Sequence, residues 1–202
     1  MSAVGEAEAL SEKGDHAAAA ALLKSRLESD PGDAEAEMAL ARICVYGLKD
    51  RERGIAILKG AAERRPGDAG VLKALATVLA MDKRRRAEAD AAYRRLAEEF
   101  PDAGVLGAYA VFARIQMLDF ERSAELHEAA IALSPGDGRL HRNYAVLLLN
   151  DLRDYERARA ELEEAVRLDP GDEASARNLK LLMERKFDPE GNLKPRRRLF
   201  GR

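Results

Sequence analysis

Apolar residues along this chain recur at intervals of three and four positions, with polar residues between them. One such stretch carries Leu72, Leu75, Ala76 and Leu79, and this spacing places side chains on one face of a helix. Short polar breaks such as LKDRE (48–52) separate neighbouring stretches. The pattern predicts pairs of helices joined by short turns, because strands would need apolar and polar residues to alternate.

The helical pairs repeat with a nearly constant period. Prolines stand at positions 31, 66, 101, 135 and 170, which are 35, 35, 34 and 35 residues apart. Proline ends the outgoing helix, because it lacks an N–H group and disfavours helical geometry in the residue before it. The aspartate that follows each proline, directly or after a glycine, can accept hydrogen bonds from the free N–H groups of the next helix. We therefore expect five N-caps, at Asp33, Asp68, Asp102, Asp137 and Asp172.

Small and bulky positions recur with the same period. Small residues, expected where two helices approach closely, stand twelve positions before each proline: Ala19, Gly54, Ala89, Ser123 and Ala158. Side chains expected to fill the second helix of each pair are Leu23, Leu58, Tyr93, His127 and Leu162. The regularity predicts that each helical pair packs against the next.

At these residues the chain resembles the tetratricopeptide repeat family, whose unit is a helix-turn-helix of about 34 residues with a closing proline. The segments that carry the resemblance best are DYERARAELEEAVRLDP (154–170) and GDHAAAAALLKSRLESDP (14–31). The resemblance implies an all-α fold, a right-handed α-solenoid of about five helical hairpins over residues 1–185. Most repeats carry one extra residue between their two helices.

The repeat also sets the expected domain organisation. The hairpins are expected at about 1–31, 32–66, 67–101, 102–135 and 136–170, followed by a capping helix at 172–186. A flexible basic tail, residues 187–202, is expected to turn away from the capping helix.

The overall composition names no partner. The 34 Lys and Arg residues are balanced by 36 Asp and Glu residues, and this net charge of -2 excludes a generally basic, nucleic-acid-coating protein. The lone Cys44 cannot form an internal disulfide, which favours a reducing compartment. The N-terminus lacks a signal-peptide pattern, and the longest apolar runs fall short of the ~20 residues of a membrane span. We therefore expect a cytoplasmic protein.

Candidate catalytic chemistry is sparse. His16, His127 and His141 are far apart in sequence and form no HExxH pair, and Cys44 has no partner for a zinc motif. His127 and His141 fall at expected packing positions, and the glycines of the repeated turns form no phosphate-binding loop. We expect no enzymatic activity, catalytic residue, metal site, cofactor or small-molecule substrate.

Function is expected on the first helices of the hairpins. By the resemblance, these helices line a concave groove that holds a peptide segment of a partner protein, so the chain is interpreted as a non-catalytic scaffold or adaptor. The main lead is an Arg-Asn pair at 142–143 that returns at 177–178. An arginine fork can grip a carboxylate, and an asparagine amide can both donate to and accept from a peptide backbone.

The expected groove residues are Arg142, Asn143, Arg177, Asn178, Lys73, Arg42, Arg114, Asn150 and Tyr46. Solvated surface, or salt bridges to nearby acids, is the alternative explanation of these side chains. If they bind a ligand, alanine at both Arg142 and Asn143 should weaken partner binding and leave melting unchanged.

The C-terminal segment KPRRRLFGR supports an alternative function. Its basic residues are Lys194, Arg196, Arg197, Arg198 and Arg202. They could dock on an anionic surface, either a membrane, a nucleic acid or an acidic protein, with the solenoid as a spacer. Opposite charge could equally draw the segment back onto the body of the chain. A protein or peptide is the favoured partner over nucleic acid or membrane, and the sequence leaves the oligomeric state open.

Overall fold

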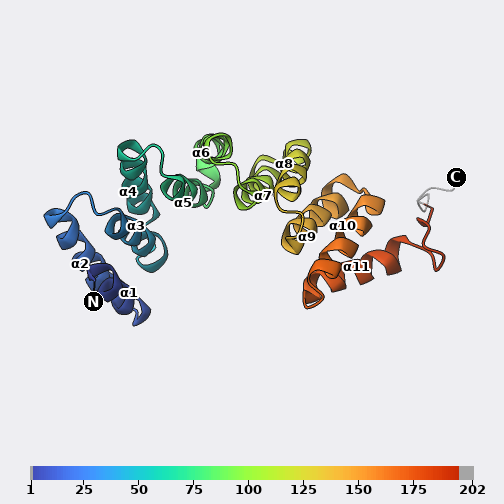
Figure 1. Ribbon diagram of the computed structural model, residues 1–202, viewed down its shortest axis with the longest axis horizontal. Helices are drawn as coiled ribbons and strands as arrows, with labels where there is room; N and C mark the ends of the chain where they lie inside the picture. The colour runs from blue at the N-terminus through green and yellow to red at the C-terminus, as the bar shows by residue number, and fades with distance from the viewer. Residues whose placement is uncertain (1, 196–202) are drawn as a thin grey trace. The chain divides into compact units, whose positions relative to one another are not determined.

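The computed structural model describes residues 2–195, and the chain divides into two compact units, residues 1–100 and 101–202. Throughout the described residues the regular structure is helical, apart from one isolated β-bridge between Phe187 and Leu193 (Figure 1). The predicted all-α fold is therefore confirmed.

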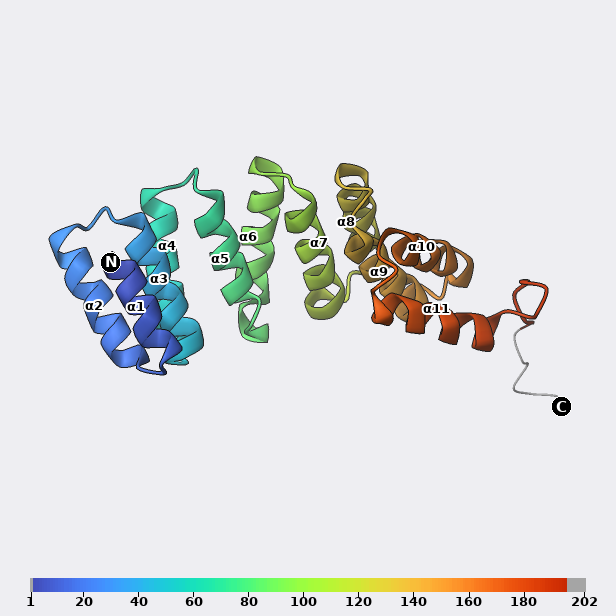
Figure 2. The same cartoon turned by 60° about the horizontal axis from the view of Figure 1, so that its bottom comes forward.

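The N-terminal unit consists of three helical hairpins, α1–α2, α3–α4 and α5–α6, in which each helix packs against its neighbours in sequence (Figure 2). Its helices are α1 (Ala3–Glu12), α2 (His16–Ser29), α3 (Ala34–Arg42), α4 (Arg51–Arg64), α5 (Ala69–Leu79) and α6 (Arg86–Glu99). The first helices α1 and α3 also contact each other.

The C-terminal unit consists of two hairpins, α7–α8 and α9–α10, and a final helix α11 that packs against α10 (Figure 1). Its helices are α7 (Ala103–Phe112), α8 (Phe120–Leu133), α9 (Gly138–Leu147), α10 (Tyr155–Leu168) and α11 (Glu173–Lys186).

Aspartate side chains cap both helices in three of the five hairpins, α3–α4, α7–α8 and α9–α10. The five predicted N-caps are confirmed: each accepts a hydrogen bond from a backbone N–H two or three residues later, as in Asp33 with Ala36 and Asp68 with Val71. The second helices are capped in the same way by aspartates that the repeat analysis did not single out: Asp15, Asp50, Asp119 and Asp154. Each cap satisfies an N–H group that has no partner within its helix.

The extra residue between the helices of a repeat is accommodated by a wider turn. The first helices α3, α7 and α9 each continue into a π-helical segment: Ile43–Gly47, Ala113–Met117 and Leu148–Leu152. The residue before each following cap then adopts a left-handed conformation, in Lys49, Leu118 and Arg153. Helix α5 ends differently, in a turn followed by the 3-10 segment Lys83–Arg85, which Asp82 caps.

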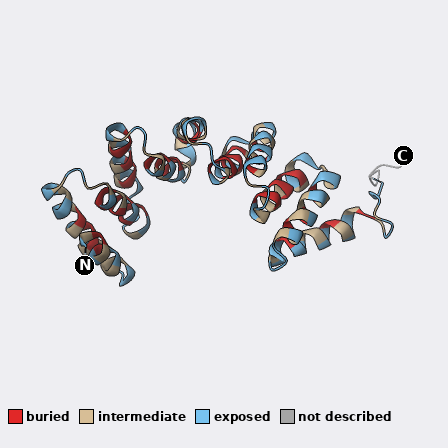
Figure 3. Cartoon of the chain, in the orientation of Figure 1, coloured by how far each residue is buried: buried red, intermediate tan, exposed pale blue. Residues whose placement is uncertain are grey.

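Small side chains lie where the paired helices touch, as predicted. Ala19, Ala89 and Ala158 are fully buried, and so is Ser123, whose hydroxyl donates to the Ala110 carbonyl at 2.8 Å. At Gly54 the approach is closest, because a Cβ built there would lie 2.3 Å from the Val45 side chain. Burial follows these contact faces in each unit (Figure 3).

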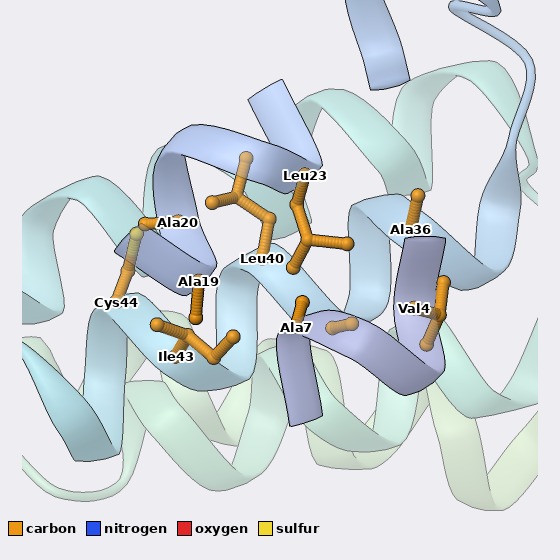
Figure 4. Close-up of a cluster of buried hydrophobic side chains, with 10 residues drawn as sticks. Val4, Ala7, Ala19, Ala20, Leu23, Ala36, Leu40, Ile43 and Cys44 are labelled. Atoms are coloured by element: carbon orange, nitrogen blue, oxygen red, sulfur yellow. The ribbon is translucent and has the colours of Figure 1, made fainter. Parts of the chain in front are cut away.

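In the N-terminal unit, buried apolar side chains from the first three helices pack in one core. Val4 and Ala7 of α1, Leu23 of α2 and Leu40 of α3 meet in one buried cluster, which also contains Cys44 (Figure 4). Burial raises the pKa of the Cys44 thiol. The predicted interior position of this cysteine is confirmed.

The residues that follow α11 pack back against the C-terminal end of that helix. Phe187 is buried in the core of the C-terminal unit, with the Arg159 guanidinium carbon 5.4 Å from its ring centroid. The Lys194 N–H donates to the Lys186 carbonyl at 2.8 Å, and the Lys194 ammonium donates to the Glu184 carbonyl at 2.8 Å. Residues 187–194 thus fold back onto the helix end instead of turning away from it as expected, because Phe187 contributes apolar surface to the core.

Candidate functional site

A hollow crosses the first helices of the N-terminal unit. It has a volume of about 460 Å³, and its walls come from α1, α3 and α5, with Leu58 of α4 beneath. Apolar side chains dominate the lining, among them Val4, Met38, Val45 and Val78. This volume lies within the range of about 300–1,000 Å³ typical of ligand pockets.

A second hollow of about 580 Å³ continues from the first along α1 and the segment after α3. The two hollows share Glu8, Arg42 and Tyr46. At the far end the Ser11 hydroxyl and His16 Nδ1 are hydrogen-bonded at 2.9 Å. The two hollows together are called the N-terminal groove below.

Glycine at position 47 is required by the wall of this groove. A Cβ built on Gly47 would lie 2.7 Å from Cγ of the His16 ring, so any side chain there would displace the imidazole. The hydrogen bond to Ser11 holds the ring against this glycine. Ser11, His16 and Gly47 together form one wall of the second hollow.

The rim of the groove carries charges of both signs. Arg42 forms an ion pair with Glu8 across α3 and α1, which neutralises both groups. The exposed side chains of Lys73, Glu12 and Glu35 form no ion pair or hydrogen bond with any residue between 2 and 195. Two carboxylates and one ammonium group are thus available to a ligand, next to a Tyr46 side chain that is 48% exposed.

Three of the nine predicted groove residues are brought together here: Arg42, Tyr46 and Lys73 all line the first hollow. The other six lie in the C-terminal unit, on α9, on α11 or on the π-helical segments that follow α7 and α9: Arg114, Arg142, Asn143, Asn150, Arg177 and Asn178.

Arg142 is engaged inside the C-terminal unit. Its guanidinium donates to Asp172 Oδ2 at 2.5 Å, and the side chains of both residues are largely buried. Asp172 also accepts from the Ser175 hydroxyl at 2.6 Å and from the Ala174 N–H at 3.1 Å. These hydrogen bonds, led by that of Ser175, lower the pKa of the Asp172 carboxyl. Arg142 therefore ties α9 to the start of α11.

Arg114 is engaged in a similar way, because its Nε donates to Asp151 Oδ2 at 2.5 Å. This ion pair joins the π-helical segments that end the first helices of two successive hairpins. By contrast, Arg177 and Asn150 are exposed, and Asn143 and Asn178 are partly buried. None of these four side chains has a hydrogen-bond partner within the described part of the chain.

Met38, Glu35, Glu8 and Glu12 are groove residues that sequence reasoning missed. A signal for two of them was present in the repeat: Met38 stands seven residues after its proline, as Lys73 does, and Glu35 stands four residues after it. The carboxylates of α1 could not be found in this way, because the first hairpin has no preceding proline to fix its register.

The tail prediction falls mainly outside the described residues. Arg196, Arg197, Arg198 and Arg202 lie there, whereas the Lys194 ammonium is hydrogen-bonded to the end of α11. No helix among residues 2–195 combines the length and apolar character needed to cross a bilayer. Within the same residues, no group of three His, Cys, Asp or Glu side chains is placed to hold a metal ion.

Family models for the tetratricopeptide repeat match residues 110–173 and residues 74–103. No protein of curated function matches the sequence.

Solved structures of tetratricopeptide repeat proteins are similar in fold. The protein TTC0263 of Thermus thermophilus is 18% identical, with a TM-score of 0.66 over 90% of this chain and 97% of its own. A fragment of MamA from Desulfovibrio magneticus RS-1 is 16% identical, with a TM-score of 0.69 over 84% of this chain and 94% of its own. YrrB, described as having an unusual peptide-binding site, is 17% identical, with a TM-score of 0.65 over 88% of this chain and 90% of its own.

Proposed function

Because the chain belongs to the tetratricopeptide repeat family, we propose that it is a non-catalytic protein-interaction scaffold whose N-terminal groove binds a peptide segment of a partner protein. One observation carries this proposal. Three successive first helices, α1, α3 and α5, line a hollow with an apolar floor and a rim on which Glu35 and Lys73 have no ion-pair partner among the described residues. The peptide-binding site named for YrrB supports a peptide as the class of ligand.

The physical character of the groove suits an extended chain. Met38 and the Tyr46 ring offer apolar surface to a ligand side chain, and each buried Å² contributes roughly 25 cal/mol. Tyr46 and Lys73 provide donors for a peptide backbone or an acidic side chain. Because the walls are helices packed on a buried core, the ordering cost falls mainly on the ligand.

The C-terminal unit contributes a second polar surface in this proposal. Asn143, Arg177 and Asn178 lie on α9 and α11. Their side chains have no hydrogen-bond partner in the described part of the chain and can form hydrogen bonds with a bound segment. Arg142 does not contact the bound segment in this proposal. It acts indirectly, because its ion pair with Asp172 holds the start of α11 in place.

A random peptide library displayed on phage, selected against the full chain, tests the proposal. Selected peptides should lose about tenfold in affinity for Met38→Glu, which places a charge on the apolar floor, a change of about 1.4 kcal/mol. Peptides that use the Lys73 ammonium should also bind Lys73→Ala more weakly. Lys83→Ala is the matched control for that variant, because Lys83 is exposed and lies outside the groove. The absence of any selected peptide, or equal binding to Met38→Glu, would contradict the proposal.

A further inference from the structure

The two hollows of the N-terminal groove differ in charge. Among the described residues, two carboxylates, those of Glu8 and Glu12, and one guanidinium, that of Arg42, line the second hollow. In the first hollow two carboxylates face two cations, because Lys73 lines it together with Arg42. We infer that the second hollow binds an arginine side chain of the partner segment. The inference rests on the proposed function and names one residue of its ligand.

Glu12 supplies the charge that attracts a guanidinium. Its exposed side chain has no ion-pair or hydrogen-bond partner among residues 2–195, whereas Arg42 is already paired with Glu8. Glu8 uses Oε1 for that pair, and its Oε2 has no partner in the described part of the chain. A carboxylate can accept two parallel hydrogen bonds from one guanidinium. The unbalanced charge of the second hollow is therefore negative and lies on a group that a ligand can reach.

Tyr46 offers a flat surface to the planar part of an arginine. The residue is 48% exposed, it lines the same hollow, and no described cation lies over its ring. The chain combines both contacts elsewhere, where the Arg157 guanidinium carbon lies 5.3 Å from the centroid of the Tyr144 ring and Nη2 lies 2.5 Å from Glu128 Oε1. Tyr46 and Glu12 present the same two groups, a ring face and a carboxylate, to a ligand.

An arginine suits this hollow better than a lysine or an acidic residue. A guanidinium can lie flat on a ring and direct two parallel N–H groups at a carboxylate, whereas an ammonium group is a point charge without this fork. An acidic side chain would meet Glu12 with no unpaired Lys or Arg among the described lining residues to balance it. Because Met38 lines the first hollow, the bound segment should carry its arginine to one side of the residue that contacts Met38.

Sequencing the peptides selected from the phage library is the first test. An arginine should be enriched at a fixed distance from the apolar residue whose binding depends on Met38. Selection against Glu12→Arg should remove this enrichment, because the new guanidinium would repel the arginine of the peptide. Glu6→Arg is the matched control, since Glu6 is exposed on the same helix and lines neither hollow, and it should select the same arginine. Peptides without arginine, or the same enrichment against Glu12→Arg, would overturn the inference.

Fluorescence anisotropy with one selected peptide measures the two contacts separately. Citrulline in place of its arginine keeps the shape and removes the charge, and should weaken binding by about fivefold or more. Glu12→Gln and Tyr46→Leu should each weaken binding of the arginine peptide about two- to fivefold. Both variants should bind a peptide with alanine in place of the arginine as tightly as the wild type does, which also shows that the groove is intact. Glu6→Gln should bind both peptides normally.

The results separate this inference from the proposed function. Equal losses for the arginine and alanine peptides would show that Glu12 and Tyr46 do not contact the arginine, and would overturn the inference. If selected peptides depend on Met38 but bind Glu12→Gln and Tyr46→Leu normally, the inference fails and the proposed function stands. If Met38→Glu affects no selected peptide, the proposed function fails as well.

Discussion

The His127 ring of α8 stacks on the Tyr144 ring of α9, with centroids 5.5 Å apart and planes inclined by 25°. His127 is fully buried, and neither of its ring nitrogens has a hydrogen-bond partner among residues 2–195. The same repeat position carries Leu23, Leu58, Tyr93 and Leu162 elsewhere in the chain. A polar ring therefore occupies a buried position that holds leucine in three of the other four repeats.

Replacing His127 with leucine should stabilise the protein. The change removes two unpaired polar atoms from the core and keeps an apolar side chain, so we expect a gain of about 1–2 kcal/mol in the free energy of unfolding. His141→Leu is the control, because His141 Nδ1 lies 2.7 Å from Glu161 Oε2 and its Nε2 lies 3.0 Å from the Pro135 carbonyl oxygen. That change should destabilise. Urea unfolding of both variants measures the difference, and a destabilised His127→Leu would contradict the expectation.

His127 should also make stability depend on pH. Burial, with a smaller effect of Arg114, lowers the pKa of His127 from 6.5 to about 4. His127 therefore binds a proton near pH 6.5 in the unfolded chain but only near pH 4 in the folded chain. The free energy of unfolding consequently falls as the pH drops from about 6.5 to about 4. The loss should reach about 3 kcal/mol at the acid end, at about 1.4 kcal/mol for each pKa unit.

The measurement is unfolding at a series of pH values between 7 and 4, where the wild-type curve falls and the His127→Leu curve falls less steeply. Carboxylates protonate in the lower part of the same range, and they contribute equally to both proteins. If the free energies of unfolding of the wild type and of His127→Leu fell in parallel with pH, His127 would bind its proton as readily in the folded chain as in the unfolded one.

Much of the fold follows from the sequence because the repeat constrains it many times over. A period of about 35 residues is fixed by the prolines and confirmed by caps such as Asp33 and Asp68, which lie at the same place in successive units. The turn within each hairpin was harder to predict. An extra residue can be absorbed as a π-helical turn, as at Ile43–Gly47, or as a 3-10 turn, as at Lys83–Arg85, and the apolar pattern is the same for both.

The candidate site was predicted only in part, because a helical position does not reveal how a side chain is paired. Arg142 and Lys73 stand at equivalent positions of their repeats, seven residues after a proline. The first is held by Asp172, whereas the second has no partner among the described residues. The next repeat begins with an N-cap aspartate in both cases, Asp172 and Asp102, so the repeat pattern does not distinguish the two positions.

Gly54 should be intolerant of any side chain. A Cβ at this position of α4 would lie 2.3 Å from Val45 Cγ2 and 3.2 Å from the Ala41 carbonyl oxygen, so α4 would have to move away from α3. We expect Gly54→Val to lower the free energy of unfolding by about 1–3 kcal/mol, as overpacking of a core does. Gly67→Val is the matched control, because a Cβ at Gly67 meets no atom within 4 Å. Equal melting temperatures for the two variants would show that the hairpin adjusts freely.

Arg142→Ala should loosen the start of α11. The change removes the ion pair at 2.5 Å with Asp172, the residue whose side chain caps that helix, so the N-terminal turn loses its link to α9. The expected cost is about 1 kcal/mol, since the pair is partly shielded from water. This differs from the sequence-based expectation that alanine at Arg142 leaves melting unchanged.

Hydrogen exchange of the α11 amides is the direct measurement: protection of residues 173–178 should fall in Arg142→Ala and persist in Arg177→Ala, whose side chain has no partner among the described residues. Unaltered exchange in Arg142→Ala would mean that Ser175 and the backbone N–H groups suffice to hold the Asp172 cap.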